Sequence, residues 1–321
     1  MPIRVLPSTL VNRIAAGEVI ERPASVVREL VENAIDAQAS HIEVMLEQGG
    51  KACISIADNG EGMQRDELPL AVQRHATSKL DGDDLFHIHA LGFRGEALPS
   101  IGSVSRMHVL SRHRNSPDAW QLSVTHGQVS EPEPARLTEG TRIDVTDLFH
   151  AVPARRKFLK TDRSETQAAI DVVQRLAMAF PHIGFRLQAD GKQRLHYAAE
   201  QGDLLEARLP RLASILGAPF QDNAMRIETL REDVLLSGYA GLPTYNRGTS
   251  TQQFLFVNGR PVRDRLILGC IRAAYQDFLA RDRHPVVALF LDMPPEQVDM
   301  NVHPAKAEVR FRDAAMVRGL L

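Results

Sequence analysis

The chain has 321 residues, of which 44% are hydrophobic and 24% are charged, as is typical of globular proteins. This length favours two domains, and the absence of long apolar runs excludes a helix that spans a membrane. The 38 basic and 40 acidic residues give a net charge of −2, so any nucleic-acid surface must be a local one. Cys53 and Cys270 are isolated, which favours a reducing compartment such as the cytoplasm.

The first clear element is an amphipathic helix over residues 26–37, "VVRELVENAIDA". Glu29, Asn33 and Asp36 follow one another at helical spacing and therefore share one polar face. A carboxylate at Glu29 could orient and deprotonate a water, and the amide oxygen of Asn33 could bind Mg²⁺. Taken alone, the same residues are also compatible with an ordinary acid and a solvated amide.

Residues 41–48 and 51–58 alternate apolar and polar side chains around a Gly-Gly pair, which predicts a β-hairpin. The second strand leads into "DNGEGM" at 58–63. Asp58 should lie at the mouth of a pocket, where Gly60 and Gly62 allow the backbone to approach a flat ligand closely. A simple surface turn is the alternative, because Asp-Asn-Gly is common turn chemistry.

Residues 64–75 are predicted to be helical, and 81–90 have no periodicity. "GFRGEAL" at 92–98 places a Gly-x-x-Gly loop at a predicted helix start, where backbone N–H groups can hold phosphate oxygens. The Walker A pattern is absent, so such phosphate binding is not of the P-loop kind. Strands are predicted at 104–112, 119–125 and 141–147.

A basic loop, "PARRKFLK", precedes a predicted helix that starts at Ser164 with Gln167 completing a capping box. A second hairpin follows, with its turn at Asp190-Gly191. After residue 200 a strand–helix–strand order predicts two parallel strands joined by a right-handed crossover. We place a domain boundary near 200. The last residues, "RDAAMVRGLL", lead us to expect that the chain is part of a longer protein.

The motifs "ELVENAIDA", "DNGEGM", "RHATSK", "LGFRGEAL" and "NVHPAK" together resemble the ATPase region of the MutL mismatch-repair family. "IAAGEVIERPASVV" and "VNGRPVRDRLI" support the resemblance, which covers nearly the whole chain. It implies an α+β fold. A GHKL-type α/β sandwich ATPase domain with an N-terminal arm and an ATP lid would occupy residues 1–200. A smaller α/β domain of the ribosomal protein S5-like type would occupy 201–321, without the C-terminal dimerisation region.

The resemblance also implies roles for single residues. Glu29 corresponds to the general base, Asn33 to the Mg²⁺ ligand, and Asp58 to the acceptor of the adenine amino group. Lys306 corresponds to a catalytic lysine that reaches the γ-phosphate of ATP from the second domain. The remaining ATP-binding residues implied by the resemblance are Gly60, Gly62, Met63, Thr77, Ser78, Lys79, Gly92, Phe93, Arg94, Gly95, Glu96 and Thr141.

The function implied is that of an ATP- and Mg²⁺-dependent mismatch-repair matchmaker, which forms a homodimer on binding ATP and is reset by hydrolysis. Its partners would be DNA, a MutS-type mismatch-recognition protein, and a downstream nuclease and helicase. Candidate DNA contacts, which could equally be ordinary solvated side chains, are Arg155, Arg156, Arg163, Arg263 and Arg265. Two alternatives remain at this point: a nucleotide-gated scaffold with negligible hydrolysis, and the ATPase subunit of a topoisomerase.

Overall fold

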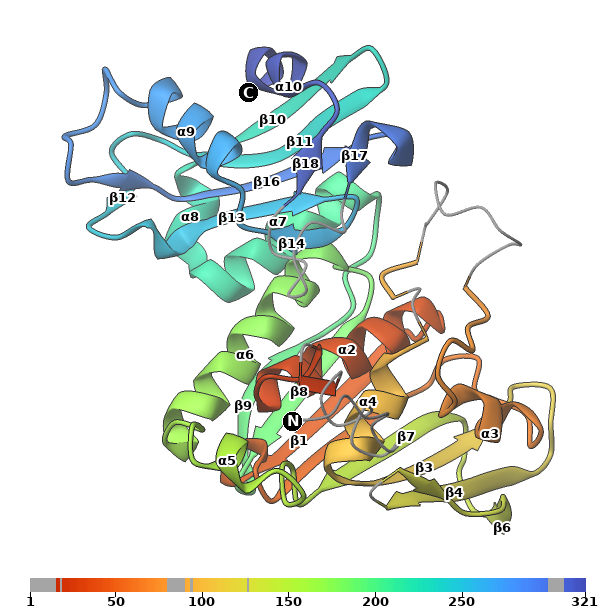
Figure 1. Cartoon of the computed structure of the whole chain (residues 1–321). Coiled ribbons are helices and arrows are strands. Elements are labelled where there is room, and N and C mark those ends of the chain that lie inside the picture. Colours follow the sequence, from red (N-terminus) through yellow and green to blue (C-terminus); the bar gives the residue numbers. More distant parts are fainter. Residues whose placement is uncertain (1–15, 18, 80–89, 93–94, 126, 300–308) are drawn as a thin grey trace, which may run out of the picture. The chain divides into compact units, whose positions relative to one another are not determined.

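The computed structural model describes residues 16–17, 19–79, 90–92, 95–125, 127–299 and 309–321. Helices and strands are mixed throughout, and the described residues form two compact units. The first unit holds the described residues of 1–83, 90–173 and 183–199, and the second holds 174–182 and those of 200–321. Figure 1 traces both units.

The first unit is built on one mixed sheet with the strand order β5-β4-β3-β7-β2-β1-β8-β9, and β6 pairs with β4. The predicted hairpin is confirmed, because β1 (His41–Glu47) and β2 (Cys53–Asp58) pair antiparallel. The second predicted hairpin is confirmed by β8 (Gly184–Ala189) and β9 (Lys192–Tyr197). The other strands are β3 (Arg106–Arg112), β4 (Ala119–Thr125), β5 (Gln128–Val129), β6 (Glu133–Ala135) and β7 (Gly140–Thr146).

Helix α2 (Pro23–Asp36) packs on β1 and β2. Its apolar stripe, which includes Val27, Leu30 and Val31, is buried, as the helical spacing predicted. Pro23 occupies the first turn of the helix, where proline costs no backbone hydrogen bond. Helix α4 (Ala97–Val104) packs on β3, β4 and α2. The end of α2 lies beside the turn that follows β2, because the Glu61 N–H donates to the Ala37 carbonyl at 2.9 Å.

Two predicted helices have different limits in the structure. Only Glu67–Ala71 forms helix α3, with Val72 as its C-cap; beyond the helix, His75 adopts a positive φ of 62° and donates its N–H to the Gly95 carbonyl. Helix α6 spans Asp162–Ala179 and so begins before Ser164. The Thr161 hydroxyl accepts the Ser164 N–H at 3.3 Å, so Thr161 and not Ser164 caps this helix. The basic loop contains the short helix α5 (Pro153–Arg156).

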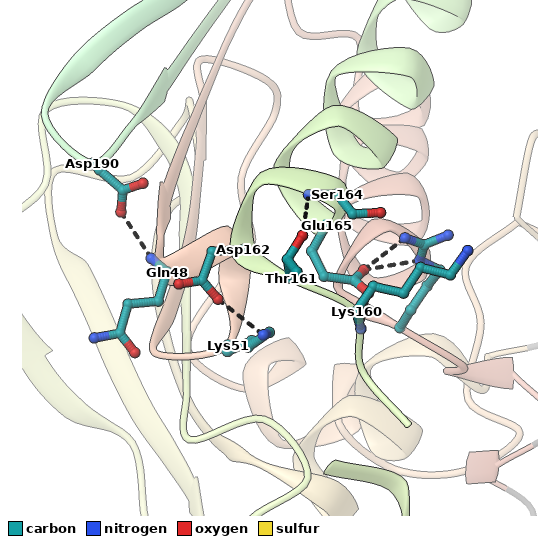
Figure 2. A network of polar contacts seen from close by, with 9 residues as sticks. Gln48, Lys51, Lys160, Thr161, Asp162, Ser164, Glu165 and Asp190 are labelled. Atoms are coloured by element: carbon teal, nitrogen blue, oxygen red, sulfur yellow. Dashed lines mark hydrogen bonds and ion pairs between the residues drawn. The ribbon is translucent and has the colours of Figure 1, made fainter. Parts of the chain in front are cut away.

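A buried carboxylate joins the starts of α2 and α6. Glu165, with 2% of its side chain exposed, lies 2.8 Å from Nη2 of Arg22, the residue preceding α2. Its other oxygen accepts the Lys160 N–H at 2.9 Å. Figure 2 shows this network together with the ion pair of Lys51 and Asp162, which are 2.9 Å apart. The network therefore fixes the entry of α2 against the basic loop.

The second unit has a sheet of order β10-β11-β16-β13-β14. Strands β13 (Gln253–Val257) and β16 (Val287–Asp292) are parallel and helix α9 (Arg265–Ala274) connects them, as predicted. The remaining strands of this sheet are β10 (Ala224–Arg231), β11 (Val234–Gly241) and β14 (Arg260–Val262). Two further pairs are β12 (Asn246–Arg247) with β15 (His284–Pro285), and β17 (Val298–Asp299) with β18 (Arg310–Phe311).

Alternation along β13 divides the core of this unit into two layers. Leu255 and Val257 join the cluster that contains α9 and α10 (Ala314–Leu320). Phe254 and Phe256 join the opposite cluster, with α7 (Leu204–Leu216) and α8 (Ala218–Asp222). The sheet is therefore covered on both faces. In the described part of the chain, no helix combines the length and apolar character that a bilayer crossing requires.

Replacing the buried carboxylate by the substitution Glu165→Gln should lower the free energy of unfolding by about 1–3 kcal/mol, because Arg22 loses its charged partner in a buried setting. Chemical denaturation measures this change. The matched control is Glu228→Gln, because Glu228 also bonds an arginine, at 2.6 Å, but with 51% of its side chain exposed. The control should leave the denaturation midpoint unchanged; equal effects of both variants would contradict the role assigned to burial.

Candidate functional site

The polar face of α2 carries Glu29, Asn33 and Asp36. Glu29 and Asn33 are half-buried, and Asp36 keeps only 8% of its side chain exposed. A solvated helix face would expose these groups more fully. The partial burial therefore agrees with a site formed against this face.

A row of polar side chains crosses three adjacent strands near the end of α2. Asp58 of β2 pairs with Thr141 of β7, and Thr141 pairs with Ser111 of β3. The hydroxyl oxygens of Ser111 and Thr141 are 2.8 Å apart, and Ser111 Oγ accepts the Met63 N–H at 2.8 Å. The structure thus brings Asp58, Met63 and Thr141 together. It adds the fully buried Ser111, which no sequence pattern indicated because only strand register places it there.

Burial raises the pKa of the Asp58 carboxyl to about 6, against the opposing effect of the Gly60 and Thr141 backbone N–H groups. The Gly60 N–H donates to Asp58 Oδ1 at 2.9 Å. Burial disfavours the charged form of a carboxylate, so this side chain is kept at an electrostatic cost. Such a group is a common sign of a functional site.

The two glycines of "DNGEGM" are required by close backbone contacts. A Cβ on Gly60 would lie 2.6 Å from the carbonyl oxygen of Ala37, the residue that follows α2. Gly62 has a φ of 73°, and a Cβ there would lie 2.1 Å from the Arg112 carbonyl oxygen. The turn therefore lies directly against the end of α2 and the end of β3.

The structure also joins the motifs "RHATSK" and "GFRGEAL". The His75 N–H donates to the Gly95 carbonyl at 3.2 Å, and a Cβ on Gly95 would be 2.4 Å from the Ala76 carbonyl. Glu96 lies 3.8 Å from the His75 ring. The predicted ATP-binding residues Thr77 and Ser78 are exposed, and the Thr77 hydroxyl accepts the Lys79 N–H at 3.1 Å.

The side chain of Lys79, a residue outside α2, lies against the polar face of this helix. Its Nζ donates to Asn33 Oδ1 at 2.8 Å and to Asp36 Oδ2 at 2.6 Å. The backbone N–H of Gly92, another predicted ATP-binding residue, donates to Asp36 Oδ2 at 3.0 Å. An ammonium group held on Asn33 Oδ1 indicates that this oxygen faces a position suited to a cation. The residues present therefore fit a Mg²⁺ ion, which takes few protein oxygens and keeps several waters.

Three predicted site residues, Phe93, Arg94 and Lys306, lie outside the described residues. Of the candidate DNA contacts, Arg155 donates to the Ile20 carbonyl at 2.8 Å and is only partly exposed. The other four candidate DNA contacts are exposed: Arg156, Arg163, Arg263 and Arg265.

Comparison with known proteins places the first unit in a nucleotide-binding class. Residues 20–150 match the family described as "Histidine kinase-, DNA gyrase B-, and HSP90-like ATPase". The solved structure of the "Aquifex aeolicus MutL ATPase domain complexed with ADP" is similar with a TM-score of 0.67 and 25% identity, covering 94% of this chain and 97% of that chain. The chain is thus a GHKL-type ATPase-fold protein, as expected.

Relatives that match the chain over its whole length identify a more specific family within this class of ATPase-fold proteins. Residues 212–321 match the family described as "DNA mismatch repair protein, C-terminal domain". The chain is 61% identical over its whole length to the DNA mismatch repair protein MutL of Rhodospirillum rubrum, and covers 51% of it. It is 60% identical to that of Paramagnetospirillum magneticum, again over its whole length, and covers 53% of it. The chain therefore belongs to the MutL family of DNA mismatch-repair proteins, and it spans about half the length of these curated relatives.

A further solved structure is similar to nearly the whole chain. The structure "Crystal Structure of N terminal domain of a DNA repair protein" has a TM-score of 0.80 and 27% identity, covering 97% of this chain and 95% of that chain. The agreement extends over both units, so the second unit is also part of the shared fold.

The raised pKa of Asp58 predicts a pH-dependent effect of Asp58→Asn on stability. Between the ordinary pKa of 3.8 and the folded value of about 6, the folded state binds the extra proton. Asp58 therefore favours folding when protonated, and this contribution is lost as the pH rises through about 6. Relative to the parent, Asp58→Asn should gain about 1–3 kcal/mol of stability between pH 4 and pH 7.5. Denaturation at both pH values measures this; a difference that does not change with pH would contradict it.

Proposed function

We propose that this chain binds ATP and hydrolyses it to ADP and phosphate, as the ATPase part of a mismatch-repair protein. The observation that carries the proposal is the partly buried Asp58 carboxylate, which lies beside Thr141 and next to a turn whose Gly60 lies against the Ala37 carbonyl at the end of α2. Oδ1 of Asp58 already accepts the Gly60 N–H, and the other oxygen is the natural acceptor for the adenine amino group. Membership of the MutL family supports this assignment.

The phosphate end of ATP is assigned to the opposite part of the same helix face. Gly92, Gly95 and Glu96 belong to the loop before α4, and Lys79 supplies a positive charge beside Asn33. Phe93, Arg94 and Lys306 complete the proposed phosphate contacts by family resemblance. Lys306 would distinguish ATP from ADP, because only ATP offers it the γ-phosphate.

Asn33 Oδ1 is the proposed protein ligand of Mg²⁺, and when bound this ion neutralises charge on the phosphate oxygens. Glu29 lies one helical turn before Asn33 and is proposed as the general base. Its carboxylate would orient the attacking water and accept a proton as the water oxygen bonds to the γ-phosphorus and the bond to the ADP oxygen breaks.

Beyond ATP chemistry, we propose the matchmaker function of the family for the longer protein. In this proposal residues 1–200 are the ATP-binding domain and residues 201–321 are an S5-like transducer domain. ATP binding brings two chains together and hydrolysis releases them, with DNA, a MutS-type protein, a nuclease and a helicase as partners. The isolated cysteines support a cytoplasmic location.

DNA contact is proposed for the exposed cations of the chain. Arg156 and Arg163 flank the start of α6, and Arg263 and Arg265 flank the start of α9. Phosphate contacts of this kind make binding steeply salt-dependent. Arg155 is a weaker candidate, because its guanidinium group already bonds the Ile20 carbonyl.

Of the two alternative functions, a scaffold without hydrolysis is disfavoured by the carboxylate at Glu29. A topoisomerase subunit is disfavoured by the mismatch-repair relatives, which match the chain over its whole length. The first experiment therefore measures hydrolysis.

The rate of Mg·ATP hydrolysis per chain should rise with protein concentration, because we propose a dimerising ATPase. Glu29→Ala should lower the rate at least about a hundredfold while ATP binding persists, as loss of a general base predicts. The matched control is Glu131→Ala, an exposed loop residue that should leave the rate unchanged. Glu29→Ala with full activity would reject Glu29 as the base and make the scaffold the better proposal.

Adenine recognition by Asp58 predicts that ATP binds more tightly than GTP by about 1–3 kcal/mol, which is roughly ten- to a hundredfold. The reason is that guanine O6 would place an acceptor opposite the carboxylate. Asp58→Asn should reduce this preference, since its amide group can turn a donor towards O6. Competition of GTP against labelled ATP measures both, and Asp118→Asn, at an exposed position, is the control. Equal competition by GTP in the parent would refute the assignment of Asp58.

A further inference from the structure

Asp36 is the last residue of α2, where a negative charge is electrostatically unfavourable. The C-terminal end of a helix carries partial negative charge, so acids are normally favoured at the other end. The last turn of α2 contains no basic residue of its own. The Asp36 carboxylate is nevertheless largely buried, and its donors must therefore come from elsewhere in the chain.

Three donors converge on this carboxylate from two distant segments. Lys79 Nζ lies 2.6 Å from Oδ2, and the Gly92 N–H reaches the same oxygen at 3.0 Å. The Leu91 N–H donates to Oδ1 at 2.8 Å. Lys79 is also mostly buried, with 23% of its side chain exposed. Asp36 thus holds together residues 79, 91 and 92, each of which is more than 40 positions away from it.

The same ammonium group is bonded to the proposed metal ligand. Lys79 Nζ donates to Asn33 Oδ1 at 2.8 Å while it contacts Asp36. Gly92 lies beside all three groups, and a Cβ on it would be 3.5 Å from both Asn33 Oδ1 and Lys79 Nζ. A lysine ammonium and a divalent cation repel each other strongly at such short range. They cannot both occupy the position that Asn33 Oδ1 faces.

We propose that Asp36 is a positioning residue of the nucleotide site: it holds the Lys79 ammonium on Asn33 Oδ1, where Lys79 and the divalent metal ion compete for one oxygen. The inference rests on the proposed binding of a nucleotide with Mg²⁺. It gives the site two alternative states, one with Lys79 on Asn33 and one with the metal there. The metal concentration that the site requires is then set partly by the Asp36–Lys79 ion pair.

The test measures metal requirement by binding, without hydrolysis. A fluorescent ADP analogue is bound to the chain, and its signal is followed while Mg²⁺ is added, giving the half-saturating Mg²⁺ concentration. Lys79→Met should lower this concentration about three- to tenfold, because the competing cation is gone. Lys79→Arg keeps the charge and should stay close to the parent. Lys79→Gln serves as a second neutral variant and should shift in the same direction as Lys79→Met, so the test does not depend on one variant folding.

Lys51→Met is the matched control. Lys51 is also in an ion pair, with Asp162 at 2.9 Å, and has 24% of its side chain exposed, but its partner lies at the start of α6 and not on the polar face of α2. Its substitution should leave the half-saturating Mg²⁺ concentration unchanged. A lower value in this control, equal to that of Lys79→Met, would overturn the proposal.

The role of Asp36 is tested by combining substitutions. If Asp36 acts by holding Lys79, then Lys79→Met should change the Mg²⁺ requirement less than twofold in an Asp36→Asn background. An undiminished effect of Lys79→Met in that background would refute the positioning role. Direct Mn²⁺ binding, followed by electron paramagnetic resonance with ADP present, should give the same order of variants.

The outcomes also separate this inference from the proposed function. A parent chain that binds no ADP analogue at any Mg²⁺ concentration would reject the proposed function itself. A parent that binds ADP, with Lys79→Met and Lys79→Gln leaving the Mg²⁺ requirement unchanged or raising it, would overturn only the competition between Lys79 and the metal.

Discussion

The site depends on a close contact between backbones where α2 ends. The Ala37 carbonyl accepts the Glu61 N–H at 2.9 Å, and Gly60 lies so near that oxygen that no Cβ could be accommodated. This contact fixes the turn after β2 against the helix. Asp58, at the end of β2, is thereby set at a defined position relative to Asn33 and Asp36. This backbone contact therefore sets the separation between the proposed adenine end and the proposed phosphate end of the site.

Local patterns in the sequence predict much of this arrangement. The apolar stripe of α2, the hairpin of β1 and β2, and the parallel pair of β13 and β16 all follow from side-chain periodicity, and the structure has each of them. Family resemblance added Thr141, whose position depends on pairing across strands. Ser111 was missed, because its place beside Thr141 is decided by register between strands 30 residues apart. Long-range contacts of this kind have no local signal.

The same reason explains the errors at helix ends. Residues 64–75 have helical composition, but only Glu67–Ala71 is helical, and beyond it His75 contacts Gly95, which sequence spacing could not show. At α6, the predicted cap Ser164 lies inside the helix, and the hydroxyl of Thr161, three residues earlier, accepts the Ser164 N–H. Glu165 was predicted only as part of a helix, and its burial against Arg22 depends on how α2 enters the fold.

Charged residues that look alike in the sequence have different surroundings in the structure. Arg156 and Arg163 are exposed and can meet an anionic partner, whereas Arg155 bonds a backbone carbonyl and Lys79 is turned inward onto α2. A nearly neutral chain can therefore hold strong local fields at a site without carrying a strong field overall. Asp58 and Asp36 are the acidic counterparts of this arrangement. Both carboxylates lie where their charge is unfavourable, one through burial and one through the helix end.

The two acids differ in how this cost is offset, and the difference matches their proposed roles. Asp58 meets the backbone N–H groups of Gly60 and Thr141, which do not cancel the effect of burial, so the pKa of its carboxyl remains raised. Asp36 meets an ammonium group and two N–H groups from Leu91 and Gly92, so its oxygens are already engaged within the chain. The first acid is the proposed acceptor for a ligand, and the second holds together the residues around the proposed site. Recognition and positioning are thus distinguished on this site by the donors that each carboxylate already has.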